Sequence, residues 1–144
     1  MKKIVFVCLG NICRSPMAEF VMKELDQEKS LRIESRATSS WEHGNSVHQG
    51  TQKILREYAI SFDSSKGSQQ ISQADFEFFD LVVGMDESNV EDLLQISAGH
   101  YDDKIKLFRP GGVPDPWYTG DFEETYKLVT AGCRDWLQWI KDRQ

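Results

Sequence analysis

The sequence Ile4-Val5-Phe6-Val7-Cys8-Leu9-Gly10-Asn11-Ile12-Cys13-Arg14-Ser15-Pro16 joins an apolar segment to the start of a helical pattern. Four consecutive apolar residues are typical of a buried parallel strand. Ser15 is a favourable N-cap, and Pro16 suits the first helical position, where its missing N–H needs no partner. The stretch therefore predicts a strand, a tight loop and a helix that begins at Pro16.

The predicted loop has the composition of a phosphate-binding site. Backbone N–H groups at a helix N-terminus, together with the helix dipole, attract anions. Gly10 lets the loop turn without steric conflict, and Arg14 offers a planar pair of N–H donors to two phosphate oxygens. The same field stabilises the thiolate of Cys8, which is the nucleophilic form of cysteine. We therefore expect Cys8 to attack a phosphate group held in this loop.

Further apolar runs alternate with amphipathic segments along the chain. The predicted strands are 4–8, 32–39, 80–85 and 104–108, and the predicted helices are 17–28, 49–58, 73–79, 87–96 and 121–141. This alternation indicates an α/β fold, a single three-layer domain in which a parallel sheet carries helices on both faces. Ligands bind beyond the carboxyl ends of such strands, where Cys8 is expected.

Composition narrows the possible partners and cofactors. A chain of 144 residues can bury a core without disulfides or structural metal, and its formal net charge of −6 disfavours binding to nucleic acid or anionic membranes. No segment is long enough to span a membrane. Three cysteines without metal-ligand spacing fit a reducing compartment. We therefore expect a cytoplasmic protein that needs no metal and no cofactor.

A second chemical motif lies in the segment 109–120, which is predicted to be a structured loop and contains three prolines and three glycines. Asp115 lies between Pro114 and Pro116, and a residue before proline is driven into an extended conformation. This restriction suits Asp115 to protonate a leaving group and then to act as a base toward water. An ordinary turn aspartate is the alternative, which the presence of Cys8 disfavours.

These motifs together resemble a known family. Cys8 and Arg14, separated by five residues and followed by Ser15, are similar to the phosphate loop of the Cys-dependent phosphatases. The loop comes first in the chain and the Asp-Pro pair comes late. This order resembles that of the low-molecular-weight protein tyrosine phosphatase family. Three further segments fit this family in order and spacing: Ala37-Thr38-Ser39, Met85-Asp86-Glu87-Ser88-Asn89 and Asp121-Phe122-Glu123.

The resemblance implies one phosphatase domain over residues 1–144 and a four-stranded parallel sheet in the order 2-1-3-4. It implies metal-independent hydrolysis of phosphotyrosine in proteins or peptides, with Cys8 as nucleophile, Arg14 as phosphate ligand and Asp115 as general acid and base. The other residues expected at the phosphate loop or substrate site are Leu9, Gly10, Asn11, Ile12, Cys13, Ser15, Trp41, Trp117 and Tyr118. We expect a monomer, with weak self-association as the alternative.

Several of these residues have two interpretations. Asn11 is a turn residue or a brace of the loop, and both can hold. Ser15 is expected both to cap the helix and to donate to the sulfur of Cys8. The family resemblance suggests that Trp41, Trp117 and Tyr118 wall a deep slot for a ring that carries phosphate, with Glu42 at the rim; aromatic core residues are the alternative.

The remaining cysteines are predicted to be buried or redox-active, and the histidines are predicted to be exposed. Cys13 is a small buried apolar residue or, as the family resemblance implies, a resolving thiol that forms a disulfide with Cys8. Cys133 lies on the apolar stripe of the last helix and is expected in the core. His43, His48 and His100 lie in loop-like sequence without partners at metal spacing. They are predicted to be surface residues.

One segment departs from the family pattern. Many family members have a His followed by Ala-Arg-Gln before the third helix, and this chain has Lys66-Gly67-Ser68-Gln69-Gln70 there. The hydrogen-bond relay attributed to that histidine is therefore not assumed. Ser35 and Ser39 remain at bracing positions, so the network can be rebuilt. The longer segment 62–70 is predicted to be a solvated loop.

Three other functions fit the sequence less well than phosphotyrosine hydrolysis. Arsenate reductases of this architecture need a further cysteine pair, and the segment 82–89 holds no cysteine. Phosphoarginine phosphatases tend to carry Thr at the position of Ile12, which makes that activity the less expected one. A phosphopeptide-binding module without turnover would need neither Cys8 nor Asp115.

Overall fold

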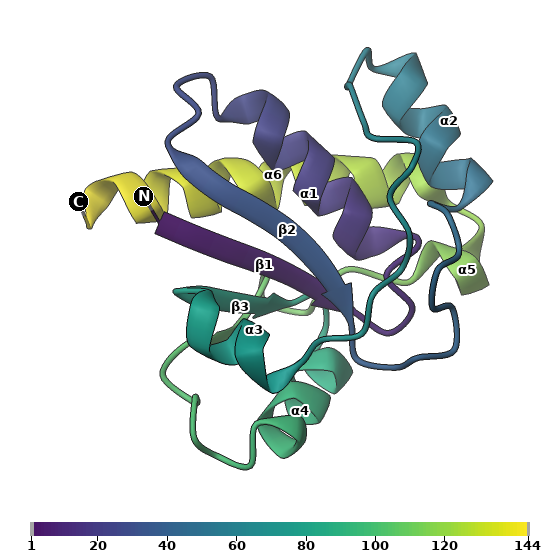
Figure 1. The fold of residues 1–144 in the computed structure, drawn as a ribbon. Coiled ribbons are helices and arrows are strands. Elements are labelled where there is room, and N and C mark those ends of the chain that lie inside the picture. Colours follow the sequence, from purple (N-terminus) through teal and green to yellow (C-terminus); the bar gives the residue numbers. More distant parts are fainter. Residues whose placement is uncertain (1, 144) are drawn as a thin grey trace.

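The sheet forms the centre of the computed structural model, which describes residues 2–143 (Figure 1). Its four parallel strands are β1 (Lys2–Cys8), β2 (Leu31–Ala37), β3 (Leu81–Gly84) and β4 (Ile105–Leu107). They lie in the order β2-β1-β3-β4, which confirms the expected 2-1-3-4 topology. Met1 and Gln144, the limits of the predicted domain, lie outside the described residues.

Helices cover both faces of the sheet. They are α1 (Arg14–Leu25), α2 (Gln49–Glu57), α3 (Gln73–Phe78), α4 (Glu87–Ile96), α5 (Pro116–Thr119) and α6 (Phe122–Asp142). Figure 1 shows α1 and α6 on one face and α3 and α4 on the other, so the predicted three-layer architecture is confirmed.

The side chains of β1 alternate between two cores. Ile4, Phe6 and Cys8 face the core that α1, α2 and α6 complete. Val5 and Val7 face the core that α3 and α4 complete. Because both faces are covered, the strand is apolar at successive positions, which is the pattern that predicted a buried parallel strand.

The predicted start of the first helix is wrong. Cys13 is the N-cap, Arg14 is the first helical residue, and no side chain caps this end. Pro16 still lies in the first turn, where backbone N–H groups have no helical partner. Ser15 therefore does not cap the helix. The uncapped N–H groups of this turn remain available to an anion.

The same helix ends earlier than predicted because Asp26 turns the chain. Its carboxylate accepts the backbone N–H groups of Ser30 and Leu31, at 3.2 and 2.9 Å. These contacts start β2 at Leu31, and the end of the helix moves from residue 28 to Leu25.

Two predicted loops contain more order than expected. The segment 109–120 includes α5, which begins because Asp115 is an N-cap and Pro116 occupies the first helical position. The segment 62–70 is not fully solvated, because Ser68 is buried and Gln70 forms a parallel bridge with Ala37 at the end of β2.

Candidate active site

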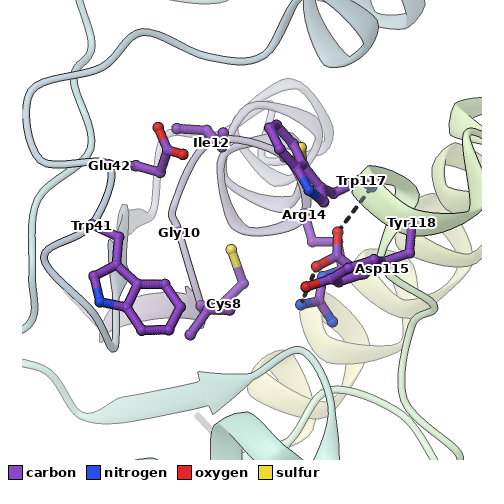
Figure 2. Close-up of a pocket in the computed structure, with 11 residues that line it drawn as sticks. Cys8, Gly10, Ile12, Arg14, Trp41, Glu42, Asp115, Trp117 and Tyr118 are labelled. Carbon is purple, nitrogen blue, oxygen red and sulfur yellow. Dashed lines mark hydrogen bonds and ion pairs between the residues drawn. The ribbon is translucent and has the colours of Figure 1, made fainter.

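A cavity of about 200 Å³ opens where the chain leaves β1 and approaches α5 (Figure 2). Every residue predicted for the site lines it except Asn11 and Ser15. The lining residues are Cys8, Leu9, Gly10, Ile12, Cys13, Arg14, Trp41, Glu42, Asp115, Trp117 and Tyr118. The fold therefore brings together two motifs that are about a hundred residues apart in the sequence.

The sulfur of Cys8 lies among hydrogen-bond donors. The backbone N–H of Asn11 donates to Sγ at 3.3 Å, and the hydroxyl of Ser15 lies 3.1 Å from it. Both contacts hold the sulfur in place beside the loop that follows β1. The contact predicted between Ser15 and the sulfur is thus present, although its capping role is absent.

Asn11 serves both purposes proposed for it. Its backbone has φ of 55°, a left-handed conformation that asparagine tolerates better than most residues. Its Nδ2 donates to the hydroxyl oxygens of Ser15 and Ser35, at 2.8 and 2.9 Å, and its Oδ1 accepts the N–H of Gln69 at 3.2 Å. The side chain therefore fixes the curvature of the loop.

The guanidinium of Arg14 is buried and most of its donors are used. Its NH1 donates to Asp86 at 2.6 Å and to the carbonyl of Val113 at 3.0 Å, while NH2 donates to Asp115 at 3.3 Å. Nε is buried without a partner among the described residues. Burial alone would lower the pKa of Arg14, but Cys8 and the two carboxylates hold that pKa above its usual value.

Asp86 is a site residue that the sequence analysis did not assign. It follows β3 directly and caps α4 through the N–H of Asn89, at 2.7 Å. Its other carboxylate oxygen holds Arg14. The carboxyl ends of neighbouring parallel strands meet at one edge of the sheet, so the place of Asp86 after β3 was a usable signal.

Asp115 faces Arg14 from the start of α5 (Figure 2). Its Oδ1 accepts the N–H of Trp117 at 3.0 Å, and its Oδ2 makes the contact with Arg14. The cap therefore fixes one oxygen, and the ion pair with Arg14 holds the other.

The aromatic residues at the cavity are rim residues. Trp41, Trp117 and Tyr118 are 78%, 57% and 78% exposed, which rules out the alternative that they belong to the core. Trp41 comes from the segment between β2 and α2, and the other two belong to α5. Figure 2 shows Trp41 and the α5 aromatics flanking the thiol of Cys8.

Lys66 belongs to a hydrogen-bond network beside the phosphate loop. Lys66 places its ammonium 3.5 Å from Asn11 Oδ1, 3.4 Å from the carbonyl of Ser35 and 3.6 Å from Glu19 Oε1. Ser35 donates to the same Glu19 oxygen at 2.6 Å. Burial lowers the pKa of Lys66, although Glu19 opposes this effect.

Two hydroxyl groups brace the loop from outside. Ser39 donates to the carbonyl of Leu9 at 2.8 Å, and Ser68 donates to that of Gly10 at 2.7 Å. Ser39 was expected here. Glu19, Lys66 and Ser68 were missed, because their spacing to the loop gives no local signal.

The prediction for the histidines is right for His43 and His100, which are exposed, and wrong for His48. His48 is the N-cap of α2, and its Nδ1 accepts the N–H of Gly50 at 3.0 Å. Its ring stacks on Phe122 and meets Trp117 edge-on. Aromatic neighbours from α5 and α6 therefore half-bury this side chain.

The three cysteines are free thiols. Cys133 lies fully buried in the core with α1, as predicted. Burial raises the pKa of the thiols of Cys13 and Cys133, and the charge of Cys8 raises that of Cys13 further. Neither residue therefore has the character of a nucleophile.

Comparisons with known proteins identify the family of this chain. The sequence model of the family described as low molecular weight phosphotyrosine protein phosphatase matches residues 3–144. The low molecular weight protein-tyrosine-phosphatase YfkJ of Bacillus subtilis is 40% identical over 156 residues, covering 100% of this chain and 99% of the relative.

Solved structures give the same result. A crystal structure of SP-PTP, a low molecular weight protein tyrosine phosphatase from Streptococcus pyogenes, matches with a TM-score of 0.96 and 61% identity, over 97% of this chain and 93% of that one. A crystal structure of DARP, drosophila arginine phosphatase, matches with a TM-score of 0.87 and 29% identity, over 98% of both chains.

The chain belongs to the low molecular weight phosphotyrosine protein phosphatase family. This membership makes it an enzyme, a protein-tyrosine phosphatase. Within residues 2–143, no helix combines the length and apolar character needed to cross a bilayer.

Proposed function

We propose that this protein hydrolyses phosphotyrosine through a phosphocysteine intermediate, with Cys8 as nucleophile, Arg14 as phosphate ligand and Asp115 as general acid and base. The observation that carries the proposal is the buried Nε of Arg14, which has no partner among the described residues and belongs to a side chain that lines the cavity with Cys8. A bound phosphate oxygen supplies the missing acceptor.

The ion pairs of Arg14 explain how phosphate enters. Asp86 and Val113 occupy NH1, which leaves Nε and NH2 as the adjacent pair for two phosphate oxygens. At NH2 the phosphate competes with Asp115, whose contact of 3.3 Å is longer than the 2.6 Å contact of Asp86. Phosphate binding therefore frees the carboxyl group of Asp115 and keeps Arg14 anchored by Asp86.

The reaction then needs two displacements at phosphorus. In the first, the thiolate of Cys8 forms an S–P bond while the P–O bond to tyrosine breaks, and Asp115 gives its proton to the departing oxygen. In the second, Asp115 takes a proton from water as that water attacks phosphorus and the S–P bond breaks. Arg14 and the loop N–H groups stabilise the charge on the equatorial oxygens. Side chains and backbone N–H groups of the protein fill every role, so turnover should persist in EDTA.

We propose that the cavity selects phosphotyrosine. Cys8 is buried while the aromatic rim residues are exposed, so the phosphate must reach below the rim. A tyrosine ring spans that depth and can stack on Trp41, Trp117 and Tyr118, each aromatic pair contributing about 0.5–1.5 kcal/mol beyond area burial. The shorter serine and threonine phosphates stop above the sulfur.

The expected result is a higher kcat/KM for phosphotyrosine than for phosphoserine, phosphothreonine or phosphoarginine, measured in EDTA on matched phosphopeptides. Phosphoarginine is the second candidate substrate, because DARP, drosophila arginine phosphatase, shares the fold. Ile12 lines the cavity and offers no hydroxyl, so Ile12→Thr should narrow the difference between phosphotyrosine and phosphoarginine. Faster turnover of phosphoarginine by the unmodified protein would refute the assignment.

We also propose that Cys13 protects Cys8 from irreversible oxidation. Because the pKa of Cys13 is raised, peroxide should attack the cavity-lining sulfur of Cys8 first, and Cys13 should then close a disulfide. Peptide mass mapping after peroxide should show a Cys8–Cys13 link that thiols reverse. Cys13→Ser should retain turnover and lose this recovery. Over-oxidised Cys8 beside an unmodified Cys13 would contradict the prediction.

The thiols and the net charge of the chain indicate its compartment and partners. We propose a cytoplasmic monomer in which residues 1–144 form one catalytic domain, acting on phosphotyrosine proteins or peptides without nucleic acid or membrane partners. The free thiols and the net charge of −6 support this setting.

A further inference from the structure

His48 lies where the phosphate loop, α2, α5 and α6 meet. Its backbone N–H donates to the carbonyl of Ile12 in the phosphate loop, at 2.8 Å. The centroids of the His48 and Phe122 rings lie 5.2 Å apart, with an interplanar angle of 18°. The centroids of the His48 and Trp117 rings lie 5.6 Å apart, with an interplanar angle of 79°. One residue therefore touches the loop of the predicted nucleophile and the helix of the predicted acid.

The orientation of the His48 ring is fixed from two sides. Its Nδ1 accepts the N–H of Gly50, so the ring cannot turn without breaking the cap of α2. Phe122 packs so closely against Gly50 that a Cβ at position 50 would overlap its ring. The stack of Phe122 on His48 thus has little freedom to shift.

Helix α5 connects the aromatic stack to Asp115, because Trp117 belongs to α5 and Asp115 is its N-cap. This helix has only four residues, and so short a helix depends on its contacts rather than on its own stability. Trp117 remains 57% exposed, and its ring makes an edge-on contact with the ring of His48. The N–H of Trp117 holds Oδ1 of Asp115, so the position of Trp117 sets the position of the carboxylate.

We propose that His48 is a positioning residue for the general acid. The stack of Phe122, His48 and Trp117 holds α5 at the distance from the phosphate loop at which Asp115 can protonate the leaving oxygen. This inference rests on the proposed role of Asp115 and assigns His48 no contact with substrate.

Two substitutions distinguish the role of the His48 ring from the role of His48 as the N-cap of α2. His48→Asn keeps a side chain that caps helices well and removes the ring. Its kcat for phenyl phosphate should fall by about 10- to 100-fold, the size of effect that a small misplacement produces. Its kcat for 2,4-dinitrophenyl phosphate, whose leaving group needs little protonation, should fall far less. His48→Phe keeps an aromatic ring at this position. Its ratio of kcat for the two substrates should therefore equal that of the unmodified protein.

Controls distinguish this proposal from the function on which it rests. His100→Asn, at an exposed histidine outside the site, should leave both activities unchanged. If Asp115→Asn shows the leaving-group-dependent loss and His48→Asn loses both activities equally or neither, the role of His48 is refuted alone. A uniform loss in Asp115→Asn would refute the acid itself, and the role of His48 with it.

A second variant covers the case in which His48→Asn does not fold. Phe122→Leu removes the ring behind His48 while keeping an apolar side chain at the start of α6. It should also lower kcat for phenyl phosphate more than for 2,4-dinitrophenyl phosphate, with inorganic phosphate binding unchanged. Equal kcat losses for the two substrates would overturn the proposal.

Discussion

Cys8→Ser should abolish turnover of aryl phosphates while vanadate or phosphate still binds. Serine would have to attack as an alkoxide, which this loop generates far less readily than a thiolate. The anion ligands remain, because Arg14 and the loop N–H groups are untouched. Steady-state turnover of p-nitrophenyl phosphate and inhibitor titration by calorimetry measure the two effects separately.

The matched control for this substitution is Cys133→Ser, in the core away from the cavity. Its sulfur donates to the carbonyl of Ala18, a contact that a hydroxyl can keep, so turnover should persist. Arg14→Ala should instead weaken both phosphate binding and turnover. Substantial turnover by Cys8→Ser would show that another group attacks phosphorus.

Asp115→Asn should lower kcat by about 10²- to 10⁴-fold for ordinary aryl leaving groups, the usual contribution of a general acid. Asparagine keeps a side-chain oxygen that can accept the N–H of Trp117, so α5 should retain its cap. Leaving groups of low pKa should suffer less, because they depart without a proton. A series of aryl phosphates measures this dependence.

Asp121→Asn offers a control at a second capping aspartate, since Asp121 caps α6 through the N–H of Glu124, at 3.0 Å. Activity there should be unchanged. If Asp115→Asn lost the same factor for every leaving group, Asp115 would serve the structure of α5 instead of proton transfer.

The sequence predicts the features of this protein that depend on neighbouring residues. The apolar run of β1, the loop that follows and the Asp-Pro pair are local patterns, and each lies where it was expected. The order of the strands did not come from such patterns, because periodicity does not specify which strands pair. Resemblance to a family supplied it.

Features that depend on tertiary contacts were missed. His48 has the local sequence of a loop histidine, and its partners Trp117 and Phe122 come from far along the chain. Lys66 looks like a solvated lysine until the fold sets it beside Glu19. Ser15 follows the rules for an N-cap, but a contact with the sulfur of Cys8 replaces that role. For His48 and Lys66, the partner was absent from the local sequence. For Ser15, the contact with the sulfur was expected, and only the capping role was wrong.

The alternation of β1 between the two cores has a consequence for how the enzyme loses activity. Amide groups of a central strand that is buried on both faces open only when the whole cooperative unit unfolds. Cys8 ends this strand, with Ile4, Phe6, Val5 and Val7 fully buried before it. The backbone at Cys8 therefore opens only with the whole domain, whereas Trp41 belongs to a loop and Trp117 and Tyr118 belong to the short helix α5, segments that can open locally. Opening of the cavity rim should therefore require a smaller free energy than opening of the strand that ends at the proposed nucleophile.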